Sequence, residues 1–201
     1  MKTYPSIPKD ISTDYNIYAF DKLDGSNIRA EWSKKRGFYK FGTKTQMLGE
    51  DHPVFGEAIP LIRSSYEKDL TDIFKEKKYD NVVCFFELHG PNSFAGYHEK
   101  ESHKVTLLDV SPLRKGIIGP TEFIDDYGHL DIPKVLYYGK ANSFFVDQVR
   151  SGTLAGMTFE GVICKASTGK NTVMFKVKNK AWLDKLKIKC KDDEKLFEQL
   201  A

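Results

Sequence analysis

The chain has 201 residues, of which 40% are hydrophobic and 13% aromatic, so it can bury the core of one domain but has no room for two full ones. No apolar run approaches the roughly 20 residues of a membrane span, and the first residues lack the apolar core of a signal peptide. Three widely spaced cysteines indicate neither a disulfide framework nor a zinc site, which predicts a reducing, cytoplasmic setting. A net charge of +3 is too small to indicate a nucleic-acid partner by itself.

Strands and one long helix are predicted for the first part of the chain. Alternating apolar residues predict three strands, over 16–22, 27–33 and 37–44, the last two joined at the turn Lys34-Lys35-Arg36. Ser64-Ser65-Tyr66-Glu67 resembles a capping box, and Tyr66, Leu70, Ile73 and Phe74 follow at helical spacing. This predicts a helix that begins there and ends near Lys77. Apolar runs predict further strands over 82–88 and 105–110.

Helices and strands are predicted in turn for the second part. Helices are expected over 119–127 and 142–151, and strands over 159–165 and 172–178. Residues 179–201 are expected to form a helical tail that partly buries Trp182, Leu186, Leu196 and Leu200, although residues 186–189 alternate in a strand-like way. The chain is therefore predicted to be a single α+β domain, residues 1–201, of antiparallel sheets flanked by helices.

A lysine at the end of the first predicted strand carries the most specific chemical signal. Lys22 begins the run Lys22-Leu23-Asp24-Gly25-Ser26-Asn27. A lysine amine can attack the α-phosphate of a nucleotide and hold the nucleotide covalently, provided that the amine is deprotonated and fixed in place. Lys-x-Asp-Gly is also a common sequence of solvated hairpin turns. The interpretation of Lys22 as a nucleophile therefore depends on the groups that accompany it.

Two carboxylates and two lysines accompany it at the ends of predicted strands or on them. Glu87 closes the apolar run 82–86, and Glu160 lies at the start of the strand 159–165. Apolar and basic residues alternate over 173–178, which places Lys176 and Lys178 on one face of a strand. Two such lysines are usually a solvated face. With Lys22 and the acids, they instead complete a set suited to phosphate chemistry.

This set fits nucleotidyl transfer. A free lysine has a pKa of about 10.4, so holding Lys22 neutral near pH 7 requires about 4 to 5 kcal/mol against its charged form. Lys176, Lys178 and a divalent cation are expected to oppose that charge while neutralising the phosphates. Hard cations prefer carboxylate oxygens and water, so the expected ligands of a hydrated Mg²⁺ or Mn²⁺ are Asp24, Glu87 and Glu160.

In these motifs the chain resembles the covalent nucleotidyltransferases, which comprise ATP-dependent polynucleotide ligases and capping guanylyltransferases. The resemblance rests on the blocks 22–27, 86–90, 159–165 and 175–178, with a less distinctive one at 107–110. Asn27 and the stretch 87–96 are similar to the RNA ligase branch, because DNA ligases and capping enzymes typically carry arginine in place of Asn27. The resemblance implies an adenylation-domain fold and an ATP-dependent RNA ligase. Lys22 would take AMP from ATP and pass it to a 5′-phosphate end, and a 3′-hydroxyl would then displace it.

The resemblance also implies nucleotide contacts, two of which depart from its usual pattern. Where RNA ligases carry a phosphate-binding arginine, the nearest residues here are Lys40 and Lys44, which lack the bidentate fork. Where an aromatic ring usually stacks on adenine, this chain has Leu107 or Leu108, so Phe159 or Phe86 would have to compensate, unless both only pack in the core. The expected ATP-binding residues are Asn27, Lys44, Glu87, Leu108, Phe159 and Lys176, and the expected catalytic residues are Lys22, Lys176 and Lys178.

Several alternatives stay open at the level of sequence. DNA ligases and capping enzymes usually append an oligonucleotide-binding barrel, but only residues 179–201 follow Lys178, so no barrel is expected here. Nucleic-acid contacts are expected instead from the basic clusters 34–36 and 176–191, if these are more than solvated faces, or from a partner protein. RNA ends are expected over DNA ends, without a membrane partner. The alternative functions are a DNA ligase-like enzyme, a capping-type guanylyltransferase, and a nucleotide- or RNA-binding module without ligation activity.

Overall fold

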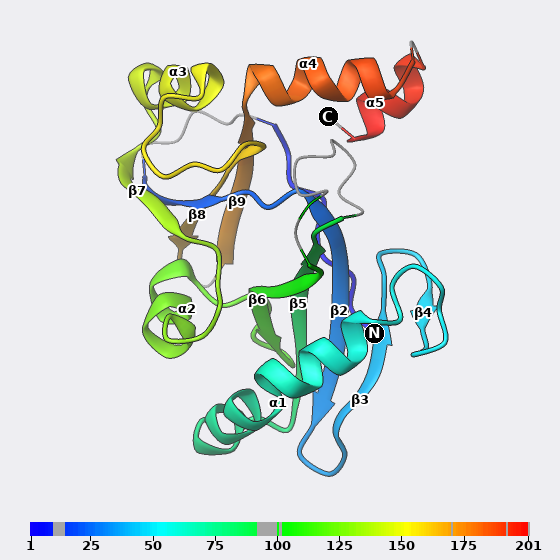
Figure 1. Ribbon diagram of the computed structural model, residues 1–201. Coiled ribbons are helices and arrows are strands. Elements are labelled where there is room, and N and C mark those ends of the chain that lie inside the picture. The colour runs from blue at the N-terminus through cyan, green and yellow to red at the C-terminus, as the bar shows by residue number, and fades with distance from the viewer. Residues whose placement is uncertain (10–14, 92–99, 101, 170, 192, 201) are drawn as a thin grey trace.

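The computed structural model describes residues 1–201 except 10–14, 92–99, 101, 170, 192 and 201. Two antiparallel sheets form its centre, and helices lie on their outer sides (Figure 1). The four-stranded sheet has the strand order β7-β1-β8-β9, and the five-stranded sheet has the order β4-β3-β2-β5-β6. The predicted α+β class, with antiparallel sheets flanked by helices, is confirmed.

The four-stranded sheet consists of β7 (Val135–Lys140), β1 (Asn16–Asp21), β8 (Gly161–Thr168) and β9 (Asn171–Lys178). The sequence did not predict β7, because this edge strand leaves most of its side chains partly or fully exposed and therefore lacks an apolar alternation. β8 begins at Gly161 rather than at Phe159. Gly161 has a φ of +132°, and an added Cβ would lie 2.2 Å from the carbonyl oxygen of Val177, so only glycine fits this close pairing with β9.

The five-stranded sheet consists of β4 (Met47–Leu48), β3 (Gly37–Gly42), β2 (Gly25–Ser33), β5 (Asn81–His89) and β6 (Lys104–Pro112). β2 pairs with β5 along its whole length, in a register that sets Asn27 opposite Glu87. Since β1 and β2 belong to different sheets, Lys22, Leu23 and Asp24 cross from one sheet to the other. The predicted nucleophile therefore lies where the two sheets meet.

Helix α1 (Ala58–Glu76) packs on the five-stranded sheet through Ile62, Tyr66, Leu70 and Phe74, which are all buried. The helical spacing predicted for this region is confirmed, but the predicted start at a capping box is wrong. The helix begins at Ala58 and carries Pro60 in its first turn, where the missing N–H of proline has no helical partner to lose. Ser64 lies inside the helix, and its hydroxyl donates to the carbonyl of Leu61 at 3.2 Å.

The other helices are α2 (Pro120–Tyr127), α3 (Ser143–Ser151), α4 (Lys180–Lys189) and α5 (Glu194–Leu200). Asn142 and Asn179 cap α3 and α4, since their side-chain oxygens accept the backbone N–H groups of Phe145 and Ala181. The strand-like alternation at 186–189 does not form a strand: α4 buries Leu186 and leaves Ile188 78% exposed. None of the described helices combines the length and the apolarity needed to cross a lipid bilayer.

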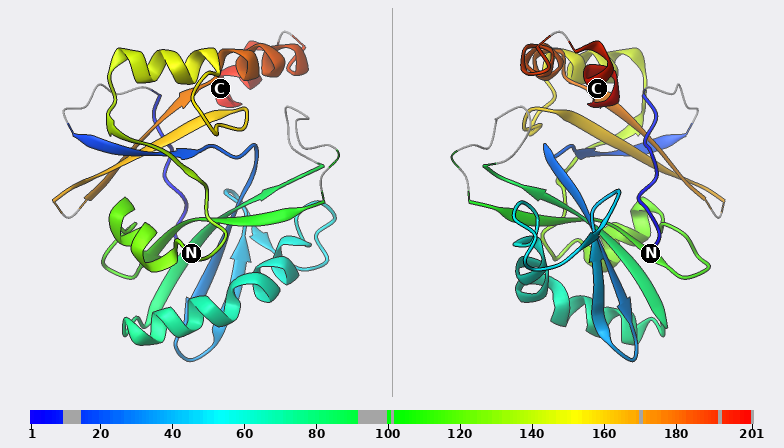
Figure 2. Two further views of the ribbon diagram at one scale, coloured as in Figure 1. Left: turned by 60° about the vertical axis from the view of Figure 1, so that its left-hand side comes forward. Right: turned by 90° about the vertical axis from the view of Figure 1, so that its right-hand side faces the viewer.

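Among the described residues, the buried apolar side chains form three clusters. The largest joins α1 and α2 to the five-stranded sheet, the second joins α3 to the four-stranded sheet, and a small third one lies under α4 and α5. The N-terminal segment, residues 1–9, runs from the five-stranded sheet to the four-stranded sheet (Figure 2). The Lys2 ammonium donates to the hydroxyl of Ser111 at 3.0 Å, and the carbonyl of Pro8 accepts the backbone N–H of Lys176 at 2.9 Å. This segment therefore ties the two sheets together.

Candidate active site

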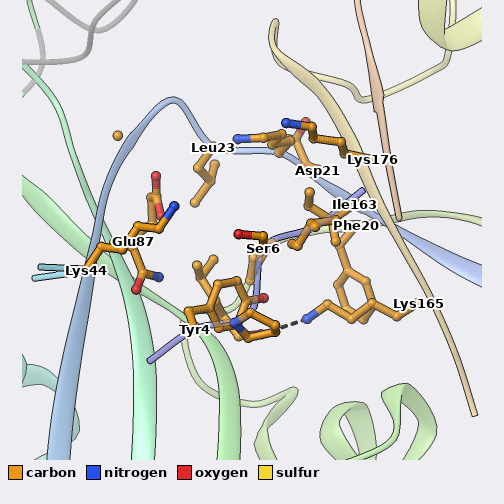
Figure 3. Close-up of a pocket in the computed structure, with 17 residues that line it drawn as sticks. Tyr4, Ser6, Phe20, Asp21, Leu23, Lys44, Glu87, Ile163, Lys165 and Lys176 are labelled. Atoms are coloured by element: carbon orange, nitrogen blue, oxygen red, sulfur yellow. Dashed lines mark hydrogen bonds between the residues drawn. The ribbon is translucent and has the colours of Figure 1, made fainter. Parts of the chain in front are cut away.

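A pocket of about 400 Å³ lies between the two sheets. Its walls come from the end of β1, the crossing residues, strands β2, β5, β6, β8 and β9, and the N-terminal segment. Figure 3 shows Lys44 and Glu87 on one side of this pocket and Lys165 and Lys176 on the other. Among the residues predicted for chemistry or nucleotide binding, those that line the pocket are Lys22, Asn27, Lys44, Glu87, Leu108 and Lys176.

Lys22 and Lys178 share one carboxylate oxygen beside this pocket. The Nζ atom of Lys22 lies 2.7 Å from Oε1 of Glu160, and the Nζ atom of Lys178 lies 2.9 Å from the same oxygen. The backbone adds to this arrangement, because the N–H of Lys22 donates to the carbonyl of Gly161 at 2.9 Å. The sheet pairing between β1 and β8 thus brings the predicted nucleophile, a predicted acid and a predicted basic residue together.

The protonation of Lys22 depends on the groups around it. Burial alone disfavours the ammonium, but the negative charges of Glu160, Glu87 and Asp24 outweigh burial and raise the pKa of Lys22. The protein's own groups therefore hold Lys22 charged. The reason is geometric, since Lys22 touches a carboxylate directly. That Lys176, Lys178 and a divalent cation together keep it neutral stays a prediction.

Glu87 is the predicted metal ligand that lines the pocket. Burial is the main cause that raises the pKa of Glu87 to about 8, and the carboxylates of Glu160 and Asp24 raise it further, against the opposing charge of Lys22. A buried carboxyl group among other acids fits a divalent cation, because a cation offsets that like-charge repulsion. Within the described part of the chain, however, no three His, Cys, Asp or Glu side chains are grouped so that they could hold a metal ion. That Asp24, Glu87 and Glu160 hold a hydrated cation therefore stays a prediction.

Asp24 and Lys178 are not among the residues that line the pocket. The indole N–H of Trp182 donates to Oδ2 of Asp24 at 3.3 Å, and the Nζ atom of Lys178 lies 3.8 Å from the centre of the same indole ring. The ammonium of Lys178 also donates to the carbonyl of Leu200 at 2.8 Å. We call Asp24, Glu160, Lys178 and Trp182 the support group, because they pack behind Lys22 against helices α4 and α5.

The remaining nucleotide-binding candidates divide between the pocket and other places. Asn27 lines the pocket, and its Oδ1 atom is buried without a hydrogen-bond partner in the residues that the structure describes, which suits a polar ligand. Lys44 lines the pocket, whereas Lys40 is exposed on β3. Leu108 also lines it. Leu107 and Phe86 are buried in the largest core cluster, and Phe159 packs in the cluster under α4 and α5, so neither phenylalanine ring reaches the pocket.

No family model matches this chain, and no curated protein matches it. Solved structures of Naegleria gruberi RNA ligase are similar in fold. A variant without ligand covers 92% of this chain and 59% of its own, with a TM-score of 0.65 at 15% identity. The structure with PPi covers 86% and 52% with a TM-score of 0.63 at 16% identity, and a variant with ATP and Mn covers 88% and 52% with a TM-score of 0.62 at 15% identity.

This chain has the fold of these RNA ligase structures. It spans between half and three fifths of the length of these ligases. The likeness concerns the backbone, so the roles of individual residues rest on the geometry described above.

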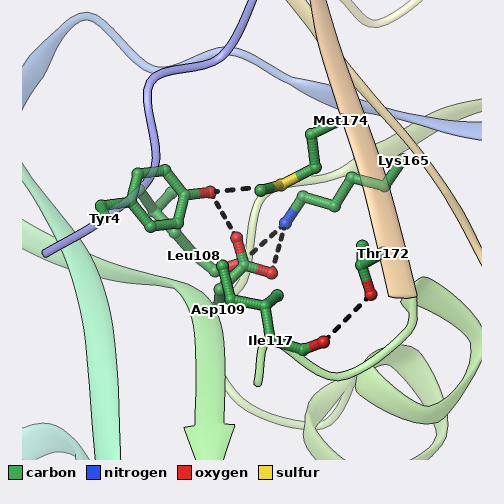
Figure 4. A network of polar contacts seen from close by, with 7 residues as sticks. All are labelled: Tyr4, Leu108, Asp109, Ile117, Lys165, Thr172 and Met174. Atoms are coloured by element: carbon green, nitrogen blue, oxygen red, sulfur yellow. Dashed lines mark hydrogen bonds and ion pairs between the residues drawn. The ribbon is translucent and has the colours of Figure 1, made fainter. Parts of the chain in front are cut away.

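Groups that sequence reasoning missed lie in the pocket or beside it. Figure 4 shows that the Tyr4 hydroxyl donates to one carboxylate oxygen of Asp109, while the ammonium of Lys165 donates to the other at 2.7 Å and to the carbonyl of Leu108 at 2.9 Å. Burial, followed by the charge of Asp109, raises the pKa of Tyr4 well above its usual value, so its hydroxyl stays a donor. Lys165 and Asp109 lie within motif blocks and were within reach of the sequence analysis. Tyr4 carried no signal, because nothing local places the N-terminal segment between the sheets.

One predicted element lies partly outside the described residues. The stretch 87–96, which is similar to the RNA ligase branch, is described only as far as Pro91. In its described part, β5 ends at His89 and Gly90 follows with a φ of +135°. Among the described residues, the expected preference for RNA therefore rests on Asn27.

Proposed function

We propose that this chain is an ATP-dependent RNA ligase that joins 5′-phosphate and 3′-hydroxyl ends through a covalent lysyl-AMP. The observation that carries the proposal is the Lys22–Glu160 ion pair at a pocket lined by Lys44, Glu87 and Lys176, within an RNA ligase-type fold. Neighbouring ligase structures were solved with ATP and Mn or with PPi, which fits a triphosphate substrate and a pyrophosphate product.

In the proposed first step, the Nζ atom of Lys22 attacks the α-phosphorus of ATP. A P–N bond forms, the bond from the α-phosphorus to the bridging oxygen breaks, and pyrophosphate leaves. Before this step Lys22 must give up a proton that its carboxylate neighbours stabilise. Lys176, which also lines the pocket, opposes the ammonium charge and receives the phosphates, since its side chain makes no hydrogen bond or ion pair to any described residue.

Lys22 is the leaving group in the second step and takes no part in the third. A 5′-phosphate oxygen attacks the α-phosphorus, the P–N bond breaks, and Lys22 regains its amine. The 3′-hydroxyl then attacks the activated 5′-phosphate and AMP leaves. A divalent cation supplies positive charge to the phosphates when bound, and Glu87, with Asp24 and Glu160 through ordered water, would hold it.

Label transfer from α-labelled ATP or GTP, with Mg²⁺ or Mn²⁺, tests the proposal. We expect adenylate on Lys22 from ATP and almost none from GTP, mapped by mass spectrometry. Lys22→Ala should take no label, whereas Lys35→Ala, in an exposed turn, should match the wild type. Label that persists in Lys22→Ala contradicts the proposal. Label mainly from GTP indicates a capping-type guanylyltransferase, and absence of label from both nucleotides indicates a binding module without chemistry.

The preference for RNA is the finer part of the proposal. An enzyme that seals strands distinguishes RNA from DNA by the 2′-hydroxyl or by the A-form geometry near the break. We expect pre-adenylated protein to seal a break with ribonucleotides on the 3′-hydroxyl side faster than an all-DNA break. Both activities should fall steeply with added salt, because lysine contacts to phosphates would supply most of the affinity. Equal sealing rates on the two substrates would be consistent with ligation and would contradict the preference for RNA.

A further inference from the structure

Trp182 contacts two charged residues near Lys22, one that is close to it in the sequence and one that is far from it. Its indole N–H donates to Oδ2 of Asp24 at 3.3 Å, and its ring face lies 3.8 Å from the Nζ atom of Lys178. Asp24 follows Lys22 closely in the chain, and Lys178 shares the Oε1 atom of Glu160 with it. With an exposure of 3%, Trp182 makes these contacts in a buried setting.

The backbone explains how Trp182 reaches this place. Helix α4 follows directly after strand β9 (Figure 1), and Asn179 forms the junction. The N–H of Asn179 donates to the carbonyl of Glu160 at 3.0 Å, while its side chain accepts the N–H of Ala181 at 2.7 Å. The first turn of α4 is therefore tied to the residue that pairs with Lys22. Trp182, in that first turn, is turned back over Lys178.

The contacts also determine how Lys178 is oriented. An ammonium has three N–H donors, and here they meet Oε1 of Glu160, the carbonyl of Leu200 and the π face of Trp182. A cation over a desolvated indole face is held more strongly than one in water. A hydrogen bond from a neutral donor to a buried carboxylate likewise fixes Asp24. One side chain thus holds an acid and a base of the site at the same time.

We propose that Trp182 is a positioning residue for the chemistry of Lys22, holding Asp24 through its indole N–H and Lys178 through its ring face. This inference rests on the proposed lysyl-AMP function and goes beyond it. If Trp182 only filled the cluster under α4 and α5, its substitution should have the same kind of effect as that of Leu186, which is also buried there. The two roles differ in what each substitution should change.

Three variants separate positioning from packing. Trp182→Phe keeps a ring face and loses the N–H donor, and Trp182→Leu loses both. Leu186→Ala weakens the same cluster and keeps the hydrogen bond to Asp24 and the cation–π contact with Lys178, which both come from Trp182. At saturating ATP we expect the single-turnover rate constant of label transfer to fall about tenfold in Trp182→Phe and about a hundredfold in Trp182→Leu. The KM for ATP should stay within about threefold, because Trp182 does not line the pocket.

Leu186→Ala is the control. It should lower the thermal midpoint and keep the rate constant within about threefold at a temperature where it is folded. A rate loss in Leu186→Ala equal to that in Trp182→Leu, or wild-type rate constants in both Trp182 variants, would overturn the inference. If Trp182→Leu does not fold, Trp182→Phe in combination with Asp24→Asn decides: the two effects should be less than additive if the N–H acts through Asp24, and additive effects contradict it.

Competitive acetylation of the protein without nucleotide gives a readout that does not depend on ligation. We expect the reactivity of the Lys178 amine, followed by mass spectrometry, to rise several-fold in Trp182→Leu and not in Leu186→Ala, because the ring covers the ammonium in the wild type. Unchanged reactivity in both variants contradicts the contact. If the wild type takes no label from ATP, the proposed function fails, and this measurement still tests the position of Trp182.

Discussion

Lys176 and Lys178 lie two residues apart on β9 and share one face of the strand, but their surroundings differ. Lys176 lines the pocket, and the described residues offer its side chain no hydrogen bond or ion pair. Lys178 is held by Glu160, Leu200 and Trp182 in the support group. Lys176 is therefore available to a ligand in the pocket, whereas Lys178 is held in place by contacts within the protein.

The charges follow the same division. Burial is the main cause that lowers the pKa of both lysines, to about 8 in the case of Lys178. The charge of Lys22 lowers both further, while Glu160 opposes the shift. Glu160 touches Lys178 directly and does not touch Lys176. We infer that Lys176 acts on the phosphates and that Lys178 acts through Glu160 on Lys22.

The largest expected effect concerns the rate of adenylation. Lys176→Ala and Lys178→Ala should each slow label transfer from ATP by about 10² or more, because each removes electrostatic stabilisation from a charged phosphoryl transition state. Arginine replacements should not fully restore the rate. A planar fork reproduces neither the point charge of Lys176 in the pocket nor the compact ammonium of Lys178 that contacts Glu160, Leu200 and Trp182 together. Wild-type rates in both alanine variants would show that the two lysines form a solvated face of the strand and have no role in adenylation.

Stability should separate the two lysines where activity does not. Lys178→Ala removes a buried partner of Glu160 and leaves the carbonyl of Leu200 without its donor, so we expect a loss of about 2 kcal/mol in the free energy of unfolding. Lys176→Ala should change it by less than about 0.5 kcal/mol. Urea denaturation monitored by circular dichroism measures both. Equal losses of unfolding free energy in the two variants would mean that Lys176 and Lys178 contribute alike to stability, which contradicts the distinction between the pocket and the support group.

The phosphate contact on the five-stranded sheet should have a smaller effect. Lys44→Ala is expected to raise the KM for ATP about tenfold, because it removes one cation from the pocket wall. Lys40→Ala is the matched control, since Lys40 is exposed on β3 and its ammonium lies 5.8 Å from the ring centre of Tyr39. Lys44→Arg should retain affinity. Equal KM values for the Lys44→Ala and Lys40→Ala proteins would refute the assignment of Lys44.

The smallest expected effect concerns the nucleobase. Leu108→Ala should raise the KM for ATP about fivefold through lost apolar contact, without a comparable change in kcat. Phe159→Leu should leave the KM within about twofold, because the Phe159 ring packs under α4 and α5. Steady-state adenylation kinetics compare the two. A larger rise in the KM for ATP in Phe159→Leu than in Leu108→Ala would indicate that the Phe159 ring contacts the nucleotide.

The residues of the candidate site were predictable to different degrees. Lys22, Glu87, Glu160 and Lys176 stand at strand ends or in a strict alternation, and such local patterns survive folding. The choice of Lys44 over Lys40 was not accessible, because both lie within the predicted strand 37–44 and only the position of the sheet decides which one reaches the pocket. The start of α1 at Ala58 was missed for a similar reason, since a capping pattern is a weak signal beside tertiary packing.

The sequence by itself determined the class of the fold, most of its strands and helices, and the chemical groups of the candidate site, because hydrophobic periodicity and motif spacing are local properties. Only the tertiary structure decided which groups meet. It set Glu160 between Lys22 and Lys178, turned Trp182 back onto Asp24, and brought Tyr4 into the pocket. It also decided the charge of Lys22, because a pKa depends on burial and on the nearest charges in space, and these come from residues far apart in the chain.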